Sequence, residues 1–301
     1  MSGFAHGNFA GKRLIVFGCG YVGGAVAREA VARGMRVTAL TRNPATAAEM
    51  HRVGVDVVVA ELASETWHAD VVGDAEYVLN AVSSGGGGVE GYRRSYLDGM
   101  KSIVAWAAAR PGNGTIVYTS STSVYPQDGG VVVDEEASTV GVGERGGILR
   151  EAEHVLLGAG GFERRFVLRL AGIYGPGRRH LVEQVRNGEV AGRGEHRLNL
   201  VHRDDVCGAI WAAWGAGPEV DGGIFNVADD GAAPKAEVVA WLARRVDVKE
   251  PRFTGEPAGG RRTVTPDRVI SNAKAKRVLG WTPRYPSFRE GYENVFAAEA
   301  V

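Results

Sequence analysis

The fold is decided by the stretch L-I-V-F-G-C-G-Y-V-G-G-A-V-A, residues 14–27. An apolar run ends at Phe17 and passes directly into a loop in which Gly18, Gly20 and Gly23 have the spacing G-x-G-x-x-G. In dinucleotide-binding turns the first glycine permits a tight bend, the second admits the pyrophosphate, and the third lets the following helix pack closely. The stretch therefore predicts a strand, a phosphate-binding loop and a helix whose N-terminus supplies amide donors.

Short apolar runs alternate with helical stretches through the first half of the chain. The predicted strands are residues 13–17, 36–40, 55–60, 77–82, 115–119 and 165–170, and the predicted helices are residues 22–33, 45–53, 92–109 and 150–158. Because the strands lack period-two alternation, we expect a parallel sheet covered on both faces. This order favours a dinucleotide site over a glycine-rich turn without a ligand. It predicts an α/β protein with a doubly wound parallel sheet, the Rossmann fold.

The character of the sequence changes in A-G-I-Y-G-P-G-R-R (171–179), which is rich in turn-forming residues. The elements predicted after it are shorter and less regular. We therefore predict a dinucleotide-binding domain over residues 1–170, to which residues 198–227 return. Residues 171–197 and 228–301 are predicted to form a smaller C-terminal substrate lobe.

Composition argues against several classes of partner. The 301-residue chain has 35 basic and 35 acidic residues, so no charge excess indicates nucleic acid or an anionic membrane surface. Its two cysteines, Cys19 and Cys207, give neither a disulfide framework nor a metal-ligand pattern. The chain begins without a signal-peptide pattern, and no apolar stretch approaches about 18 residues. We therefore expect a cytoplasmic protein that binds a small molecule and no metal.

The residues after the second predicted strand indicate which dinucleotide binds. NAD-binding proteins usually carry a carboxylate about 20 residues after the loop, which holds the ribose 2′-hydroxyl. Here Thr41 and Arg42 occupy this position, and an arginine pairs with a 2′-phosphate that a carboxylate would repel. We therefore expect NADP, with NAD as the alternative; Arg42 would otherwise be a solvated surface arginine. The fold predicts further cofactor contacts from Cys19, Tyr21, Val22, Glu61, Leu62, Ala81, Val82, Ser83 and Thr119.

Six motifs follow one another along nearly the whole chain. They are G-C-G-Y-V-G-G (18–24), S-S-T-S-V-Y (120–125), R-L-A-G-I-Y-G-P-G (169–177), V-H-R-D-D-V (201–206), F-N-V-A-D-D (225–230) and L-G-W-T-P-R-Y (279–285). With them the chain resembles the extended short-chain dehydrogenase/reductase superfamily, in its NAD-dependent epimerase/dehydratase group. The resemblance implies a Rossmann domain, a small substrate lobe and chemistry at the nicotinamide. It also implies that Ser121 polarises the reacting carbonyl or alcohol.

The usual acid/base pair of that family is missing. Its Tyr-x-x-x-Lys pattern, aligned on the helix that follows, falls on Arg145 and Leu149. A guanidinium can stabilise an oxyanion but stays protonated, so Arg145 is a poor proton donor or base. The departure resembles the atypical branch of the superfamily, whose members keep the cofactor fold without the standard pair.

Other residues would then complete the site. Tyr174 is the candidate proton relay, with packing at the mouth of the cleft as its alternative role, and Tyr125 is the weakest candidate. Ser123, Arg178 and His202 are candidate substrate contacts, although for His202 we favour a structural role. The wider basic set indicates either an anionic substrate such as a nucleotide sugar or a solvated surface: Arg145, Arg178, Arg179, His180, Arg193 and Arg197.

Two functions fit these residues. The first is an NADP-dependent oxidoreductase, or a cofactor-retaining epimerase, acting on a polar carbonyl or alcohol. The second is a non-catalytic NADP(H)-binding redox sensor or regulatory protein, which the loss of the Tyr/Lys pair favours. Ser121 and the basic residues favour the enzyme. Members of the family often dimerise through the helices after strands four and five, so residues 92–109 are the predicted contact of a homodimer.

Overall fold

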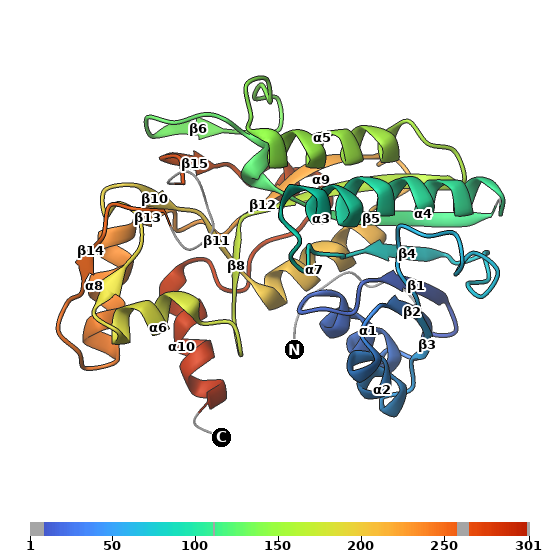
Figure 1. Ribbon diagram of the computed structural model, residues 1–301, viewed down its shortest axis with the longest axis horizontal. Coiled ribbons are helices and arrows are strands. Elements are labelled where there is room, and N and C mark those ends of the chain that lie inside the picture. The colour runs from blue at the N-terminus through green and yellow to red at the C-terminus, as the bar shows by residue number, and fades with distance from the viewer. Residues whose placement is uncertain (1–8, 111, 258–264, 300–301) are drawn as a thin grey trace.

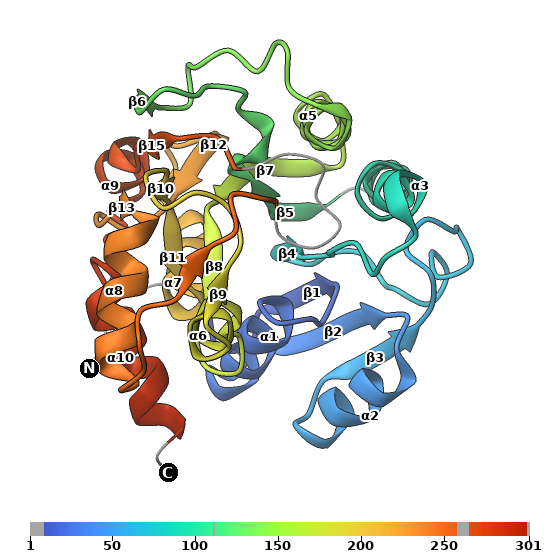
Figure 2. The same cartoon turned by 60° about the vertical axis from the view of Figure 1, so that its left-hand side comes forward.

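The computed structural model describes residues 9–110, 112–257 and 265–299. Its centre is a seven-stranded sheet in the spatial order β12-β7-β5-β4-β1-β2-β3, seen almost edge-on in Figure 2. Every neighbouring pair of strands is parallel, as the apolar runs predict. The strands are β1 (Arg13–Phe17), β2 (Arg36–Thr41), β3 (Asp56–Val59), β4 (Tyr77–Asn80), β5 (Asn113–Ser121), β7 (Phe162–Leu170) and β12 (Gly222–Val227).

Helices cover both faces of this sheet, because successive strand residues point to opposite sides. Leu14 and Val16 of β1 share a buried cluster with Trp211, whereas Ile15 and Phe17 belong to the cluster of Trp106. The first face carries α1 (Gly23–Ala32), α2 (Pro44–Arg52), α7 (Arg203–Trp214) and α9 (Ala273–Leu279). The second carries α3 (Gly88–Arg93), α4 (Gly99–Ala108) and α5 (Glu144–Leu157), with α4 and α5 side by side in Figure 1. The doubly wound Rossmann fold is thus confirmed.

Two helices differ from the sequence-based expectation. The helix predicted over residues 92–109 is interrupted by a π-helical turn at Arg94–Asp98, which joins α3 to α4. Helix α5 begins at Glu144 rather than at residue 150. A Cβ at Gly146 would lie 2.8 Å from the Ser123 carbonyl oxygen, so this turn packs tightly on the exit of β5. That tertiary contact outweighs the low helix propensity of Gly146 and Gly147, which hides the helix start in the sequence.

A second group of elements forms a smaller lobe beside the strand ends (Figure 1). Helices α6 (His180–Arg186), α8 (Lys235–Arg245) and α10 (Phe288–Glu299) enclose their own buried cluster. Eight short strands of the described residues form four pairs with one another, and none of the eight joins the main sheet. The pairs are β8 (Gly172–Tyr174) with β11 (Leu200–His202), β9 (Glu189–Val190) with β14 (Arg252–Phe253), β10 (Arg197–Leu198) with β13 (Ala233–Pro234), and β6 (Val131–Val133) with β15 (Arg268–Ile270).

The described part of the chain contains no helix long and apolar enough to cross a bilayer.

Strand β12 lies next to β7 in the main sheet, while β11, at the start of the returning segment, pairs with β8. The outer ends of the predicted domain and lobe, residues 1–8 and 300–301, lie outside the described residues, as do residues 258–264 within the lobe.

Candidate functional site

The glycine loop has the shape that a dinucleotide requires. Gly18 has φ +91°, and a Cβ there would lie 2.8 Å from the Cα of Val82. A Cβ at Gly23 would lie 2.0 Å from the Gly18 carbonyl oxygen, so only glycine lets α1 start against the loop. Around Gly20, by contrast, a Cβ would meet no described atom within 4 Å. The fold itself therefore requires glycine at positions 18 and 23. Gly20 leaves its backbone open, and a pyrophosphate fits there.

The side chains between these glycines have different surroundings. Cys19 is buried, and burial raises the pKa of its thiol to about 12, so it is a core residue rather than a reactive thiol. Val22 is also buried and serves as the N-cap residue of α1. At these two predicted contacts the main chain alone faces outward. Tyr21 is half-buried and reaches the smaller lobe, where its hydroxyl donates to the Pro176 carbonyl oxygen at 3.0 Å.

A charged cluster lies at the ends of β2 and β3. Arg42 is 53% exposed, and its guanidinium lies against Gly85, where an added Cβ would be 1.6 Å from Nη2. The Glu61 carboxylate lies 4.0 Å from Arg42 and 3.9 Å from Arg94. Glu61 therefore has an arginine on either side, and the cluster keeps a net positive charge. Thr41 is buried directly before it.

An open pocket of about 540 Å³ continues from this cluster. Leu62 is buried at its start and packs on Gly99, where an added Cβ would lie 2.9 Å from Cδ2. The pocket is lined by residues that follow Leu62 and by residues of α3 and the π turn: Ala63, Ser64, Glu90, Gly91, Arg94 and Asp98. It lies where the fold predicts the adenine end of a dinucleotide.

The exits of β1, β4 and β5 meet at one edge of the sheet. The Thr119 hydroxyl donates to the Asn80 carbonyl oxygen at 3.2 Å, and the Asn80 side chain accepts from the Val82 N–H at 3.3 Å. The Ala81 N–H donates to the Phe17 carbonyl oxygen at 2.9 Å, directly before the glycine loop. The structure thus brings the predicted contacts Ala81, Val82 and Thr119 beside the loop. Ser83 follows them on the exit from β4.

Ser121 ends β5 and begins a 3₁₀ turn over Thr122–Val124. Its hydroxyl oxygen accepts a hydrogen bond from the Ser123 N–H at 3.1 Å, which fixes the side chain at the strand exit. Ser121 is partly exposed and Ser123 is exposed. Both predicted hydroxyls are therefore accessible at the edge of the sheet where Rossmann folds bind ligands.

A buried polar network lies directly behind Ser121, and sequence reasoning missed it. The Arg169 guanidinium donates to both Glu153 carboxylate oxygens, at 3.1 and 2.7 Å, and the Ser120 hydroxyl donates to Glu153 at 2.5 Å. Arg169 also donates to the Tyr125 hydroxyl at 2.8 Å, and this hydroxyl donates to Asn226 at 2.8 Å. Tyr125 is thereby a structural residue. The sequence signal that could have indicated this network is the presence of Arg169 and Glu153 among the apolar residues of a strand and a helix.

The two residues that stand in place of the missing acid/base pair, Arg145 and Leu149, lie in different surroundings. Leu149 is buried in the core, so nothing cationic replaces the lysine there. Arg145 is exposed, and its guanidinium carbon lies 5.7 Å from the centre of the Tyr92 ring. This is a cation–π contact with the facing helix α3.

The structure argues against two of the sequence-based assignments, because both side chains are committed to the core of the smaller lobe. Tyr174 is 3% exposed, and its hydroxyl lies so close to Gly291 that an added Cβ there would be 1.7 Å away. Burial raises the pKa of Tyr174 well above its usual value, so it is unsuited to relay protons. His202 is fully buried, caps α7 by accepting from the Asp204 N–H at 3.2 Å, and stacks on Tyr285 at 4.2 Å. Burial also lowers the pKa of His202 to about 4, which supports its structural role.

Two residues of the predicted basic set have different surroundings: Arg178 lies near Tyr21, and Arg197 lies in the smaller lobe. The guanidinium carbons of Arg178 and Arg203 lie 5.4 and 5.2 Å from the centre of the Tyr21 ring. Arg197 pairs with Asp267 at 3.1 Å, which neutralises its charge. Arg178 is therefore the predicted basic residue that the structure brings to the glycine loop.

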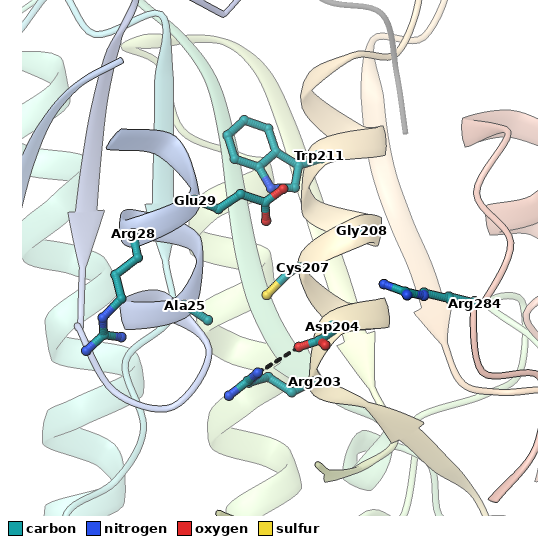
Figure 3. Close-up of a pocket in the computed structure, with 9 residues that line it drawn as sticks. All are labelled: Ala25, Arg28, Glu29, Arg203, Asp204, Cys207, Gly208, Trp211 and Arg284. Carbon is teal, nitrogen blue, oxygen red and sulfur yellow. Dashed lines mark hydrogen bonds and ion pairs between the residues drawn. The ribbon is translucent and has the colours of Figure 1, made fainter. Parts of the chain in front are cut away.

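A further pocket, of about 390 Å³, lies between α1 and α7 (Figure 3). Its walls are Ala25, Arg28, Glu29, Arg203, Asp204, Cys207, Gly208, Trp211 and Arg284. In Figure 3 the Cys207 sulfur points between the two helices, and Arg203 pairs with Asp204 at 2.9 Å. Burial raises the pKa of Cys207 to about 12. None of the residues predicted for catalysis or cofactor binding lines this pocket.

Comparison with known proteins agrees with this geometry. Residues 18–141 match a family model described as NAD(P)H-binding. Protein YeeZ of Escherichia coli (strain K12) is 30% identical over 283 residues, covering 91% of this chain and 97% of that protein. The chain belongs to the NAD-dependent epimerase/dehydratase family of short-chain dehydrogenases/reductases. NAD(P) is the cofactor of this family, and the glycine loop fits it.

Two further relatives of this dehydrogenase/reductase chain extend the comparison. A 3-diazoavenalumate denitrifying reductase of Streptomyces is 27% identical, over 93% of this chain and 98% of that enzyme. The structure of UDP-glucose 4-epimerase from Thermotoga maritima superposes with a TM-score of 0.81 at 18% identity, over 96% of this chain and 100% of the epimerase. At that identity the second likeness shows the fold alone.

Proposed function

We propose that this protein is an NADPH-dependent oxidoreductase that acts on a polar, anionic carbonyl or alcohol. The observation that carries the proposal is the juxtaposition of an open glycine loop and an accessible Ser121 at one edge of the sheet. Bound NADPH would supply hydride to the substrate carbon. Ser121 would donate a hydrogen bond to the reacting oxygen, and Arg145, at the rim, would stabilise developing negative charge. Ser123 would contact the substrate beside Ser121.

Preference for NADPH rests on Arg42. Its exposed guanidinium lies at the end of β2, where the fold presents the adenosine ribose, and Arg94 adds a second positive charge near Glu61. A charge-assisted, bidentate pair with a 2′-phosphate fits Arg42, whereas a 2′-hydroxyl gains little from it. Arg178, close to the glycine loop, would favour an anionic substrate such as a nucleotide sugar. The nucleotide-sugar epimerase with the same fold, and the reductase name of the Streptomyces relative, support this class.

The cofactor preference is tested by titrating NADPH and NADH into the wild type and Arg42→Ala, with nicotinamide fluorescence as the readout. We expect the Kd of NADPH to rise about 10-fold or more, because a charged pair contributes about 1.5 to 3 kcal/mol, while the Kd of NADH changes little. Arg52→Ala removes an exposed arginine near the end of α2 and is the matched control for net charge. Equal losses for NADH and NADPH would contradict the role of Arg42.

A second function, a non-catalytic NADP(H) sensor, is favoured by one observation: Arg145 and Leu149 provide no proton donor. The two functions differ in turnover. Oxidation of NADPH is followed at its absorbance band against a panel of aldehydes, ketones and nucleotide-linked ketosugars, with Ser121→Ala as the comparison. Turnover that Ser121→Ala abolishes supports the oxidoreductase, and tight NADPH binding without turnover across the panel supports the sensor.

A homodimer through α4 and α5 is also proposed. These two helices lie side by side on one face of the sheet (Figure 1) and would present a common surface.

A further inference from the structure

We propose that Tyr96, on the π turn between α3 and α4, is the proton donor that replaces the missing tyrosine of α5. The inference rests on the proposed oxidoreductase function and names the residue that completes its site. Three other tyrosines near the cleft are unsuitable. Tyr174 is buried against Gly291, Tyr125 is held by Arg169 and Asn226, and Tyr118 is fully buried inside the sheet.

The first step of the argument is the position of Tyr96 relative to the lost pair. On α5, Arg145 stands where the family has its tyrosine, and it lies 5.7 Å from the ring of Tyr92. The rings of Tyr92 and Tyr96 have centroids 4.4 Å apart. Helix α5 packs against α3 and the π turn, as Figure 1 also shows. A phenol lost from one helix is thus replaced, across that helix contact, by a phenol on its neighbour.

The second step is the π turn itself. It spans Arg94–Asp98, with Tyr96 at its centre, between two ordinary α-helical segments. A π turn inserts an extra residue into a helix and rotates the side chains that follow, and such turns are frequent at functional sites. Here the side chains of Ser95 and Leu97 are buried on either side, while Tyr96 keeps part of its surface exposed.

The third step is the surroundings of the hydroxyl group. The Ser84 backbone, on the exit from β4, and the positive charge of Arg178, in the loop after β8, both act to lower the pKa of the Tyr96 hydroxyl. Both groups belong to segments where we expect a ligand, because the cofactor would follow the β4 exit and Arg178 is the predicted basic substrate contact. Burial nevertheless raises the pKa of Tyr96 above its usual value, so the phenol is protonated at neutral pH, as a donor must be.

These contacts define the reaction step. When bound, NADPH would supply the hydride for the new C–H bond at the carbonyl carbon, and the carbonyl π electrons would move to oxygen. The Tyr96 O–H bond breaks as its proton joins that oxygen, which gives the alcohol and a tyrosinate. Arg178 and the Ser84 N–H stabilise the tyrosinate until water returns a proton. Ser121 holds the same oxygen from the β5 side.

The first experiment needs no substrate. All nine tyrosines are labelled with ¹³C at Cζ, the Tyr96 resonance is assigned with Tyr96→Phe, and its ionisation is followed between about pH 8 and pH 12. If Tyr96 lies beside the nicotinamide, the positive ring of bound NADP⁺ should lower its pKa by about one pH unit or more relative to bound NADPH. Tyr77, also half-buried but at the opposite end of β4, is the internal control and should titrate alike in both complexes.

Each outcome has a separate meaning. A Tyr96 resonance that titrates at the same pH in both saturated complexes overturns the proposal, while the binding of both cofactors leaves the proposed function standing. Failure of both NADP⁺ and NADPH to bind refutes the proposed function instead. On any carbonyl that the enzyme reduces, Tyr96→Phe should lower kcat by about 100-fold or more with an unchanged Kd for NADPH. Tyr77→Phe should retain the wild-type kcat, and a fully active Tyr96→Phe would overturn the proposal.

Discussion

Asp229, a carboxyl group that follows β12, is almost completely buried, with 4% of its surface exposed. Its Oδ1 accepts from the Gly231 N–H at 3.1 Å, but its Oδ2 has no hydrogen-bond partner among the described residues. Burial, together with the nearby charges of Asp230 and Asp205, raises the pKa of Asp229 to about 7. Because an unfolded aspartate ionises near pH 4, this group ionises less readily in the folded protein. Its ionisation therefore opposes folding.

We expect Asp229→Asn to stabilise the protein at high pH only. The free energy of unfolding of the wild type should fall relative to the variant as pH rises from about 4 to about 7, because the folded form must then carry a desolvated charge. At pH 8 the variant should be about 1 to 3 kcal/mol more stable, and at pH 4 the two should be nearly equal. Urea unfolding at both pH values measures this. Asp230→Asn, at a partly exposed carboxylate paired with Lys276, should show no such gain; a pH-independent difference for Asp229→Asn would contradict the account.

At the scale of elements, the buried network joins α5 to β7 and to β5, the strand that ends at Ser121. Glu153 belongs to α5, Arg169 to β7 and Ser120 to β5, and the ion pair of Glu153 and Arg169 is almost fully buried. The network links these elements where β5 ends, so it holds the strand exit in place. Buried charges of this kind are tolerated because each is paired and hydrogen-bonded.

Breaking one side of this pair should be worse than replacing both sides. We expect Glu153→Leu to lower the free energy of unfolding by about 3 to 5 kcal/mol, because it leaves the Arg169 charge buried without its carboxylate. The double variant Glu153→Leu with Arg169→Met should lose less than the single variant. Chemical denaturation of the wild type, both single variants and the double variant completes the cycle. Additive losses would show that the pair is not energetically coupled.

At the scale of the whole molecule, Tyr21 connects the glycine loop to the smaller lobe. It comes from the cofactor loop, yet its hydroxyl bonds to Pro176, and its ring lies near the guanidinium groups of Arg178 and Arg203. A Cβ at Gly175 would lie 2.7 Å from the Tyr21 hydroxyl, so the two segments are in close contact.

Removing this ring should loosen the loop after β8. We expect amide hydrogen exchange over residues 175–179 to be about 10-fold faster in Tyr21→Ala than in the wild type, which corresponds to a loss of about 1.4 kcal/mol in local stability. Tyr21→Phe keeps the ring and loses only the hydroxyl, so its exchange should change much less. Amides of β1, far from the loop, provide the reference. Unchanged exchange over residues 175–179 in Tyr21→Ala would show that the ring does not hold the loop.

Much of the fold was predictable because its signals are local. Strand β1 was predicted to the residue, and Gly18 and Gly23 take the turn and packing roles that their spacing indicates. The start of α5 was not predictable, because Gly146 is favoured there by a contact with Ser123 across a loop. The orientation of Tyr174 was missed for a similar reason: it depends on Gly291, more than 100 residues later.

By itself, the sequence determined the doubly wound sheet and the glycine loop, because apolar periodicity and glycine geometry act over one turn or one strand. The resemblance to the family added the loss of the acid/base pair. Tertiary structure alone decided which polar groups meet. It paired Glu153 with Arg169, turned Tyr174 into the smaller lobe, and brought the Tyr96 ring against Tyr92, which contacts Arg145. Such contacts join residues distant in the chain, and they depend on how whole helices and strands pack, which short-range patterns do not encode.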